Sequence, residues 1–256
     1  MASTNTLGGT GEVARARQIL TGCRAALLDM NGTFMFGEDR LSAAEDFGAT
    51  YRALGGAMLP DTAVTAGILA CVAHMARLYD DPARVDDFPG VLETLGELPE
   101  TAALPSRERE RLAEVVARHE LGHVPAPYAA AVQRLARSLS LVLVANIWAP
   151  KALWLEELAR VGISDAFAVC VFSSDSRSMK PSQALFHAAL RGIGIPNPGP
   201  YSDVVCIGDS LRCDVAGPQA LGIRTIWIDR IDSGAPSRGP VPDARVPNLL
   251  ALVPER

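Results

Sequence analysis

Lysine is scarce in this 256-residue chain, because only Lys151 and Lys180 occur among its 24 basic residues. The net charge of −5 gives no basic excess that would attract nucleic acid or an anionic membrane, so we expect neither as a partner. Five cysteines are present without CxxC spacing, and they predict neither a disulfide framework nor a zinc knuckle. Each lysine is therefore unusual enough to be weighed as a functional residue.

Long apolar segments are also missing. The longest run, residues 63–76, is too short to cross a bilayer and contains a histidine. The first residues, MASTNTLGGTGEVARAR, have no apolar core of the kind that a signal peptide needs. We therefore expect a cytoplasmic protein in which residues 1–10 form a loose tail. The oligomeric state has no signal in the sequence.

The second half of the chain alternates between strand and helix patterns. Such alternation forms parallel βαβ units, so the predicted fold class is α/β, with a doubly wound, Rossmann-like parallel sheet. A Pro- and Gly-rich loop is expected at 233–247, before a short C-terminal helix. The predicted strands are 24–29, 141–146, 166–172, 203–208 and 224–228. The helices expected between the later strands are 127–138, 150–161, 182–192 and 214–221.

The segment between the first two strands has a helical pattern throughout. Apolar spacing there predicts four helices, separated by proline and glycine. We therefore expect an α/β core made of residues 1–36 and 128–256, with a helical cap domain, 37–127, inserted into it. The four predicted helices are 42–55, 61–79, 84–97 and 106–121.

Polar residues follow the carboxyl ends of several predicted strands. Asp29, Asn146 and Asp209 occupy such ends, and Lys180 and Asp214 lie near the starts of the following helices. Ligands of doubly wound sheets bind at this edge. Two carboxylates held together repel unless a cation lies between them, and ligands that are all oxygen suit Mg²⁺. Lys180 would balance a bound anion such as phosphate.

These motifs resemble those of the haloacid dehalogenase-like hydrolases, in the C1-type branch with a helical cap inserted after the first motif. Motif one is DMNGT (residues 29–33), and motif two is the degenerate pair Ala145-Asn146. Motif three is Lys180-Pro181, and motif four is GDSLRCD, residues 208–214. The resemblance covers roughly residues 24–230.

The resemblance implies a Mg²⁺-dependent phosphatase acting on a small phosphorylated metabolite. Asp29 would be the nucleophile and would form an aspartyl phosphate. Asp29, Asp209 and the backbone carbonyl of Asn31 would hold Mg²⁺, and Asp214 would orient the metal shell. Two features argue against other chemistries in the family. This chain keeps the GDS…D motif that the dehalogenases lack, and its cap contains no lysine, which the phosphonoacetaldehyde hydrolases need.

The phosphate would be bound by three further residues that the resemblance identifies. Lys180 would neutralise charge on both the nucleophile and the phosphate. Thr33 would contact the phosphate or only complete the turn after Asp29. Asn146 would either bind the phosphate or cap the helix that follows it.

Two positions depart from the family pattern. Asn31 replaces the usual acid/base carboxylate, and Ala145 replaces the usual hydroxyl of motif two. An amide cannot hand a proton to a leaving oxygen at pH 7, and loss of such a group typically costs ~10²–10⁴-fold in rate. Five interpretations stay open: a leaving group that needs no proton, a substitution introduced to trap a complex, a phosphotransferase, a catalytically impaired binding protein, or another acid from the cap, with Glu38, Asp39 and His74 as candidates.

A rival pattern is HELGH (residues 119–123), which matches the HExxH motif of zinc hydrolases. On a helix, its two histidines would share a face and bind Zn²⁺, with the glutamate as general base. No GxxH continuation follows, so a third ligand would have to come from elsewhere, with Glu156 and His187 as candidates. A zinc metallohydrolase is therefore the less favoured alternative.

Overall fold

The computed structural model describes residues 6–230 and 239–253, and within them six strands form one parallel sheet. The strand order is β3-β2-β1-β4-β5-β6, which confirms the predicted doubly wound α/β fold. In the register, Leu28 at the end of β1 lies beside Leu143 and Ile207 on the two neighbouring strands. The strands are β1 (Ala25–Leu28), β2 (Ser140–Ala145), β3 (Phe167–Phe172), β4 (Val204–Gly208), β5 (Arg224–Ile228) and β6 (Ala244–Val246).

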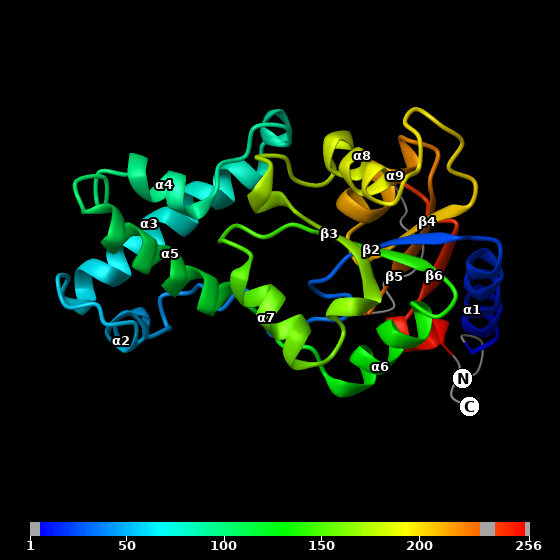
Figure 1. Cartoon of the computed structure of the whole chain (residues 1–256), viewed down its shortest axis with the longest axis horizontal. Helices are drawn as coiled ribbons and strands as arrows, with labels where there is room; N and C mark the ends of the chain where they lie inside the picture. The colour runs from blue at the N-terminus through cyan, green and yellow to red at the C-terminus, as the bar shows by residue number, and fades with distance from the viewer. Residues whose placement is uncertain (1–5, 231–238, 254–256) are drawn as a thin grey trace, which may run out of the picture.

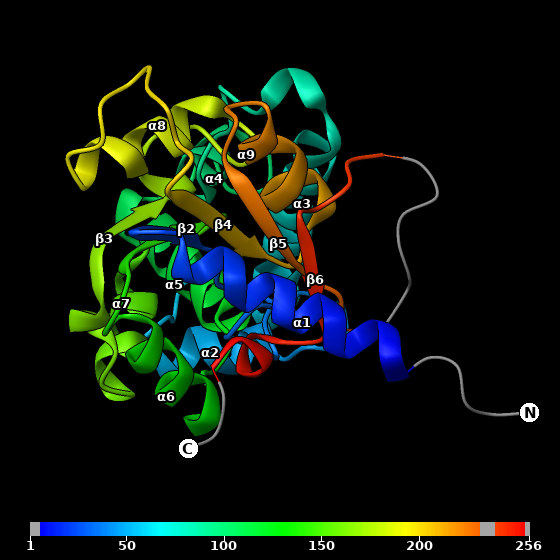
Figure 2. The same cartoon turned by 90° about the vertical axis from the view of Figure 1, so that its right-hand side faces the viewer.

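Helices cover both faces of the sheet, because the central strands are apolar on both sides. Leu27 and Val142 face one side, where they pack in the same cluster as Phe186 of α8. Leu28 and Leu143 face the other side. Figure 2 shows α8 and α9 above the sheet and α1, α6 and α7 below it. These helices are α1 (Thr6–Thr21), α6 (Ala126–Leu135), α7 (Ala152–Arg160), α8 (Gln183–Gly192) and α9 (Gly217–Gln219).

A second group of helices lies to one side of the sheet, between β1 and β2 in the chain (Figure 1). Its members pack against one another, and Ile68, Leu95 and Leu112 are fully buried among them. This group occupies the segment predicted as a cap, although the boundaries at 37 and 127 stay a prediction. The helices are α2 (Phe47–Ala53), α3 (Asp61–Asp80), α4 (Val91–Glu97) and α5 (Ser106–Glu120).

Two chain segments that run side by side connect this group to the sheet. Phe36 and His123 form an antiparallel bridge in which each backbone N–H donates to the other carbonyl at 2.9 Å. Further along, the N–H of Asp39 donates to the carbonyl of Glu120 at 3.2 Å, and that of Arg40 donates to the carbonyl of His119 at 2.9 Å. We call residues 36–40 and 119–123 together the neck.

Helix α3 is longer than the apolar run that the sequence suggested. It covers 20 residues, which by length and composition is enough to cross a membrane, and 28% of its most apolar window is buried. Core helices of other proteins meet the same criterion. Its buried residues, which include Val64, Ile68 and Met75, pack within the helical group.

Both ends of the chain differ from the sequence-based expectations. Residues 6–10, expected in a loose tail, begin helix α1, whereas residues 1–5 lie outside the described range. Within the expected loop 233–247, residues 244–246 form strand β6 and extend the sheet, and residues 233–238 are not described. The expected C-terminal helix is the 3₁₀ turn Leu249–Leu252.

Two predicted helices are shorter in the structure. The helix expected at 42–55 begins only at Phe47, because the Asp46 carboxylate accepts the N–H of Ala49 and caps α2. The helix expected at 84–97 is a 3₁₀ turn, Pro82–Arg84, followed by the separate helix α4. Helices α3, α5, α7 and α8 lie within two residues of their predicted ranges.

Candidate functional site

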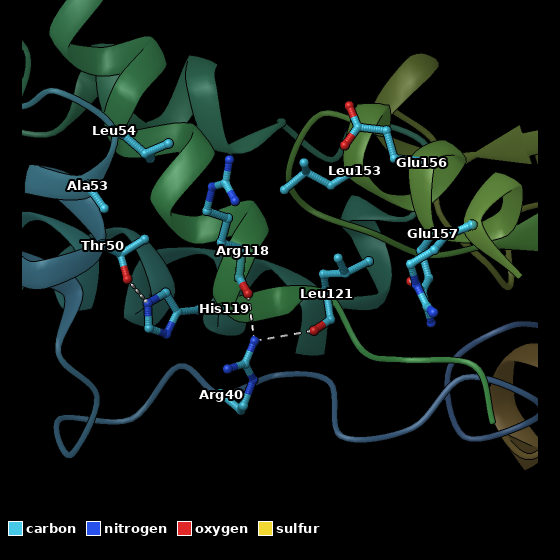
Figure 3. Close-up of a pocket in the computed structure, with 11 residues that line it drawn as sticks. Arg40, Thr50, Ala53, Leu54, Arg118, His119, Leu121, Leu153, Glu156 and Glu157 are labelled. Atoms are coloured by element: carbon cyan, nitrogen blue, oxygen red, sulfur yellow. Dashed lines mark hydrogen bonds and ion pairs between the residues drawn. The ribbon is translucent and has the colours of Figure 1, made fainter.

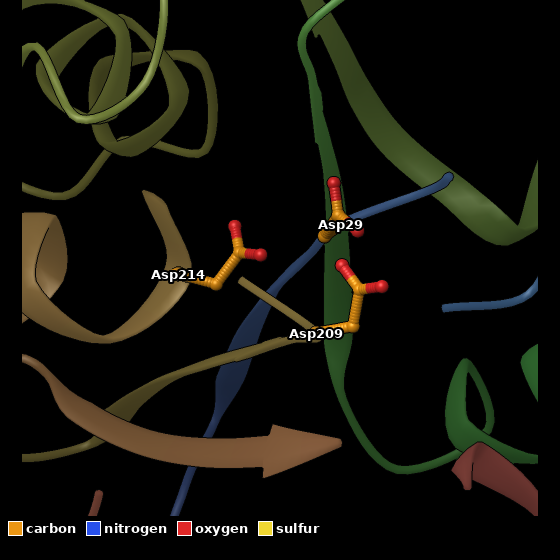
Figure 4. A group of neighbouring side chains, drawn as sticks. All are labelled: Asp29, Asp209 and Asp214. Carbon is orange, nitrogen blue, oxygen red and sulfur yellow. The ribbon is translucent and has the colours of Figure 1, made fainter. Parts of the chain in front are cut away.

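Three aspartates meet at the carboxyl edge of the sheet (Figure 4). Asp29 directly follows β1 and Asp209 follows its neighbour β4, so the parallel register places them side by side. Asp214 comes from a π-helical turn, Leu211–Ala216, where a regular helix had been predicted from residue 214. One carboxylate oxygen from each lies within 4.8 Å of the others. The predicted gathering of Asp29 and Asp209 is therefore present in the structure.

Two glycines allow this close approach. At Gly32, φ is +72°, and an added Cβ would lie 2.1 Å from Oδ2 of Asp209. At Gly208, an added Cβ would lie 2.3 Å from Cγ of Asp214. Real Cβ atoms do not approach other atoms so closely, so any other residue would displace a carboxylate. The glycines of motifs one and four are thus needed for the acidic cluster itself.

Lys180 supplies the positive charge inside this cluster. Its Nζ lies 2.6 Å from Oδ1 of Asp29 and 2.8 Å from Oδ1 of Asp214, and the side chain is only 3% exposed. Burial by itself lowers the Lys180 pKa, but the carboxylates of Asp214 and Asp29 more than offset this and hold the pKa well above its ordinary value. Lys180 is therefore a charged ammonium, placed where an anion at Asp29 would meet it.

Thr33 and Asn146 each form hydrogen bonds to a residue beside the predicted phosphate position, Thr33 to Asp29 and Asn146 to Lys180. The Thr33 hydroxyl donates to Oδ2 of Asp29 at 2.8 Å and so orients that carboxylate. The Asn146 amide accepts the N–H of Lys180 at 2.8 Å and donates to the Lys180 carbonyl at 3.2 Å. Asn146 does not cap the following helix, because α7 begins only at Ala152. The predicted phosphate contacts of both residues stay predictions.

The acidic cluster has the chemistry of a divalent cation site. Burial and the Asp29 carboxylate raise the pKa of Asp209 to about 6, although Arg230 opposes the shift. Burial also raises the pKa of Asp214. A divalent ion among these carboxylates would offset the repulsion between their negative charges, and an all-oxygen ligand set fits Mg²⁺. Within the described ranges, this is the one cluster of three side chains that could ligate a metal.

A cavity of about 350 Å³ opens over the cluster and extends to the helical group. Tyr79 and Val72 of α3 and Trp148 of the loop after β2 form its apolar wall. Asn31 also lines the cavity, and its Oδ1 is buried without a hydrogen-bond partner among the described residues. The full lining is Asp29, Asn31, Asp39, Leu41, Val72, Tyr79, Glu120, Asn146, Trp148, Lys180, Asp209, Ser210, Cys213 and Asp214.

Arg230 is a site residue that the sequence reasoning missed. Its Nη2 lies 3.1 Å from Oδ2 of Asp209, and its guanidinium lies 5.7 Å from the centre of the Phe36 ring. Arg230 follows the end of β5 by two residues, so the rule applied to the other strand ends would have identified it. Tyr79 was also missed, because the last turn of a helix gives no sequence signal for an inward-facing side chain.

The HELGH segment is not a zinc site in the described structure. Helix α5 ends at Glu120, so His123 does not share a helical face with His119. The Glu120 carboxylate instead accepts the backbone N–H groups of Trp148 at 2.6 Å and Ala149 at 2.9 Å. The zinc alternative is therefore wrong, because the helix stops before the second histidine and Glu120 is engaged with the loop after β2.

A larger cavity of about 740 Å³ lies between α2, the end of α5 and α7 (Figure 3). The Arg40 guanidinium there donates to the carbonyl of Arg118 at 2.6 Å, and His119 shares a hydrogen bond of 2.9 Å with Thr50. Burial lowers the His119 pKa, which favours the neutral imidazole. Among the described residues, this cavity has no cluster of ligands for a metal, so the smaller one is the candidate site.

The sheet is all parallel, and three aspartates and a buried lysine meet at its carboxyl edge, where doubly wound sheets bind their ligands. The fold and the site therefore define a Rossmann-like α/β enzyme whose candidate active site is built from aspartates. The haloacid dehalogenase-like hydrolase family matches residues 23–222. The chain belongs to this family, which confirms the family that its motifs indicated, whereas the C1-type branch stays a prediction.

Individual relatives agree with this membership. Phosphoserine phosphatase from Thermus thermophilus is 30% identical over 133 residues, which are 52% of this chain and 51% of that protein. The chain spans about half, or less, of the length of the curated relatives it matches. A 2-haloacid dehalogenase from Pseudomonas syringae pv. tomato has a similar structure, with a TM-score of 0.61, 23% identity, and coverage of 90% of this chain and 96% of the other. A HAD phosphatase from Thermococcus onnurineus has a TM-score of 0.58, 21% identity, and coverage of 90% and 95%. At these identities the two structures support the fold alone.

Proposed function

We propose that the protein is a Mg²⁺-dependent phosphohydrolase that acts on a small phosphorylated metabolite through an aspartyl phosphate on Asp29. The observation that carries the proposal is the buried contact of Lys180 with Asp29 and Asp214, beside Asp209, at the carboxyl edge of the sheet. This arrangement offers a nucleophile, a place for a divalent ion and a fixed positive charge within one cavity.

Asp29 is the nucleophile in this proposal. Thr33 holds its Oδ2 and Lys180 holds its Oδ1, so the carboxylate is oriented before the substrate arrives. A carboxylate oxygen attacks phosphorus in line, the ester P–O bond breaks, and its electron pair leaves with the substrate oxygen. Water then attacks the aspartyl phosphate, which releases inorganic phosphate and regenerates the Asp29 carboxylate.

The charge on the phosphoryl group is balanced from two directions. Lys180 carries an ammonium that the Asp214 and Asp29 carboxylates keep protonated, and it stabilises the negative oxygens in the transition state. Bound Mg²⁺, held by Asp29, Asp209 and the carbonyl of Asn31, would supply further electrostatic stabilisation. Asp214 orients the Lys180 ammonium through their ion pair, and its own carboxylate is fixed because it accepts the Ser210 N–H at 3.0 Å.

The helical group α2–α5 acts as the cap, with boundaries near 37 and 127. Support comes from the cavity, whose apolar wall includes Val72 and Tyr79 of α3, and from the neck, which is the paired connection to the sheet. A cap that closes over the substrate excludes water and strengthens every electrostatic interaction inside.

A phosphate-release screen in the presence of Mg²⁺ tests this function. We expect release by the unaltered chain, its loss on chelation of the metal, and its loss in Asp29→Asn, which lacks the nucleophile. Asp165→Asn, at an exposed acid before β3 and thus at the other edge of the sheet, is the matched control and should retain activity.

The same screen distinguishes the alternatives. The proposal fails if Asp29→Asn retains full phosphate release, or if neither the unaltered chain nor Asn31→Asp releases phosphate or binds Mg²⁺. The latter result would favour a binding protein. Transfer of ³²P from substrate to an added alcohol in place of water would favour a phosphotransferase.

A further inference from the structure

Five carboxyl groups line the cavity, and one of them differs from the rest. Four are held by partners described above: Lys180, Arg230, and the backbone N–H groups of the loop after β2. The Asp39 carboxylate has neither a hydrogen bond nor an ion pair with any described residue. It is therefore the carboxyl group that is free to interact with a substrate. The five are Asp29, Asp39, Glu120, Asp209 and Asp214.

The backbone of Asp39 is fixed although its side chain is free. Its φ is +58°, a left-handed conformation that residues other than glycine seldom adopt. The N–H of Asp39 donates to the carbonyl of Glu120 at 3.2 Å, and its own carbonyl accepts the N–H of Leu41 at 2.8 Å. The neck thus holds Asp39 in a bend of the kind that clusters at functional sites.

The surroundings of Asp39 favour the protonated carboxyl. Although Asp39 is an exposed residue, desolvation of its carboxyl by the surrounding protein and the charge of the nearby Glu38 raise its pKa to about 6. A general acid is most effective when its pKa lies near the working pH. Glu38 and His74, the other two acids expected from the sequence, are not among the described residues that line the cavity.

We propose that Asp39 is the general acid of the reaction and protonates the leaving oxygen, which Asn31 cannot do. As the bond between Asp29 and phosphorus forms, the ester P–O bond breaks, and the departing alkoxide takes the proton of the Asp39 carboxyl. The resulting Asp39 carboxylate accepts a proton from the water that then attacks the aspartyl phosphate. Inorganic phosphate leaves, and both aspartates return to their starting states. This inference rests on the proposed function.

The test compares two esters that differ in their need for a proton. Nitrophenolate leaves p-nitrophenyl phosphate without protonation, whereas the alkoxide of 2-phenylethyl phosphate needs it. We expect Asp39→Asn to lower kcat/KM on the alkyl ester by roughly 10²–10⁴-fold and to leave the nitrophenyl ester nearly unchanged. Asparagine is the replacement of choice, because it tolerates the left-handed backbone at this position.

Two further variants report on the proton itself. In Asn31→Asp/Asp39→Asn, the carboxyl at residue 31 should restore hydrolysis of the alkyl ester. Because an acid must be protonated to donate, alkyl-ester kcat/KM of the unaltered chain should fall as the pH rises through about 6. Glu38→Gln should move this fall to lower pH, because the Glu38 charge helps to raise the Asp39 pKa. Asp165→Asn should change neither ester.

Several results would overturn the inference while the proposed function stands. Equal losses on both esters in Asp39→Asn would indicate a structural role. A loss confined to 2-aminoethyl phosphate would indicate recognition of a substrate cation, and no loss on the alkyl ester would show that Asp39 is dispensable. Failure of the unaltered chain and of Asn31→Asp to release phosphate from any ester would overturn the proposed function and the inference together.

Discussion

The chain contains a built-in comparison between a buried and an exposed lysine. Lys180 lies 2.6 Å from Asp29 and is 3% exposed, whereas Lys151 lies 2.7 Å from Asp175 and is 42% exposed. The two N–O distances are thus nearly the same, and the lysines differ in burial and in the second ion pair that Lys180 makes with Asp214. We therefore predict very different stability losses for Lys180→Met and Lys151→Met.

The magnitudes follow from the cost of an uncompensated charge. Without the ammonium of Lys180, the Asp29 and Asp214 carboxylates would be buried together without a cation, a loss of about 3–5 kcal/mol in the free energy of unfolding. This equals roughly two to four powers of ten in the folding equilibrium. Lys151→Met removes a solvated pair, and its expected loss is about 0–1 kcal/mol.

Urea unfolding followed by tryptophan fluorescence measures both values, since Trp154 is fully buried. The experiment is done at pH 7.5 with the metal chelated, and then repeated with Mg²⁺, which should restore part of the stability of Lys180→Met. Burial already raises the Asp214 pKa, and the loss of the Lys180 ammonium, which opposes this shift, should raise it further. A group whose pKa is higher in the folded than in the unfolded chain stabilises the fold at acid pH, so this contribution to the stability of Lys180→Met should be lost as the pH rises. Equal losses in the two variants at pH 7.5 would refute the reasoning.

Three further predictions concern the glycine turn, the neck and the cavity. Gly32→Ala should abolish Mg²⁺ binding by calorimetry, because its Cβ would displace the Asp209 carboxylate, whereas Gly55→Ala, also at positive φ but with open space around it, should bind Mg²⁺ normally. Burial raises the Glu120 pKa to about 8. The protonated Glu120 therefore stabilises the folded state fully below about pH 4.5, the unfolded range, and this contribution is lost as the pH rises through 8. Glu120→Gln should remove this pH dependence of the free energy of unfolding, measured in urea between pH 5 and 8.5. Esters with a second phosphate should give lower kcat/KM than phosphates of uncharged alcohols of similar size, because Lys180 is the one cation among the described residues that line the cavity. A preference for bisphosphates would contradict this.

The sheet and the acidic cluster could be predicted because both follow from local rules. Strand runs such as residues 141–146 are short, apolar and separated by helical patterns, and parallel strands bring their carboxyl ends to one edge. Asp29 and Asp209 needed only this rule to be placed together. The three-residue strand β6 was missed because so short a run gives no alternation, and its pairing with β5 arises from the tertiary fold.

The roles of Asn146 and Glu120 could not be predicted, for a different reason. Each makes its shortest hydrogen bonds to backbone groups far away in the chain, and a backbone partner leaves no trace in the sequence. Glu120 was interpreted as part of a zinc motif because the pattern of residue types matches. The end of α5 at that residue and its hydrogen bonds to the loop after β2 exclude this role. Local patterns thus identify which residues reach the edge of the sheet, and three-dimensional contacts decide what they do there.

The pairing of Phe36 with His123 also bears on how such a protein can change over evolutionary time. The chain leaves the sheet and returns to it at adjacent points, because Phe36 and His123 are paired. A short loop could therefore replace the more than eighty residues between them. A different insertion of any length could be joined there without altering the strand order or the acidic centre. Val72 and Tyr79, which line the cavity, and the aspartates of the acidic cluster are thereby encoded in separable stretches of one gene.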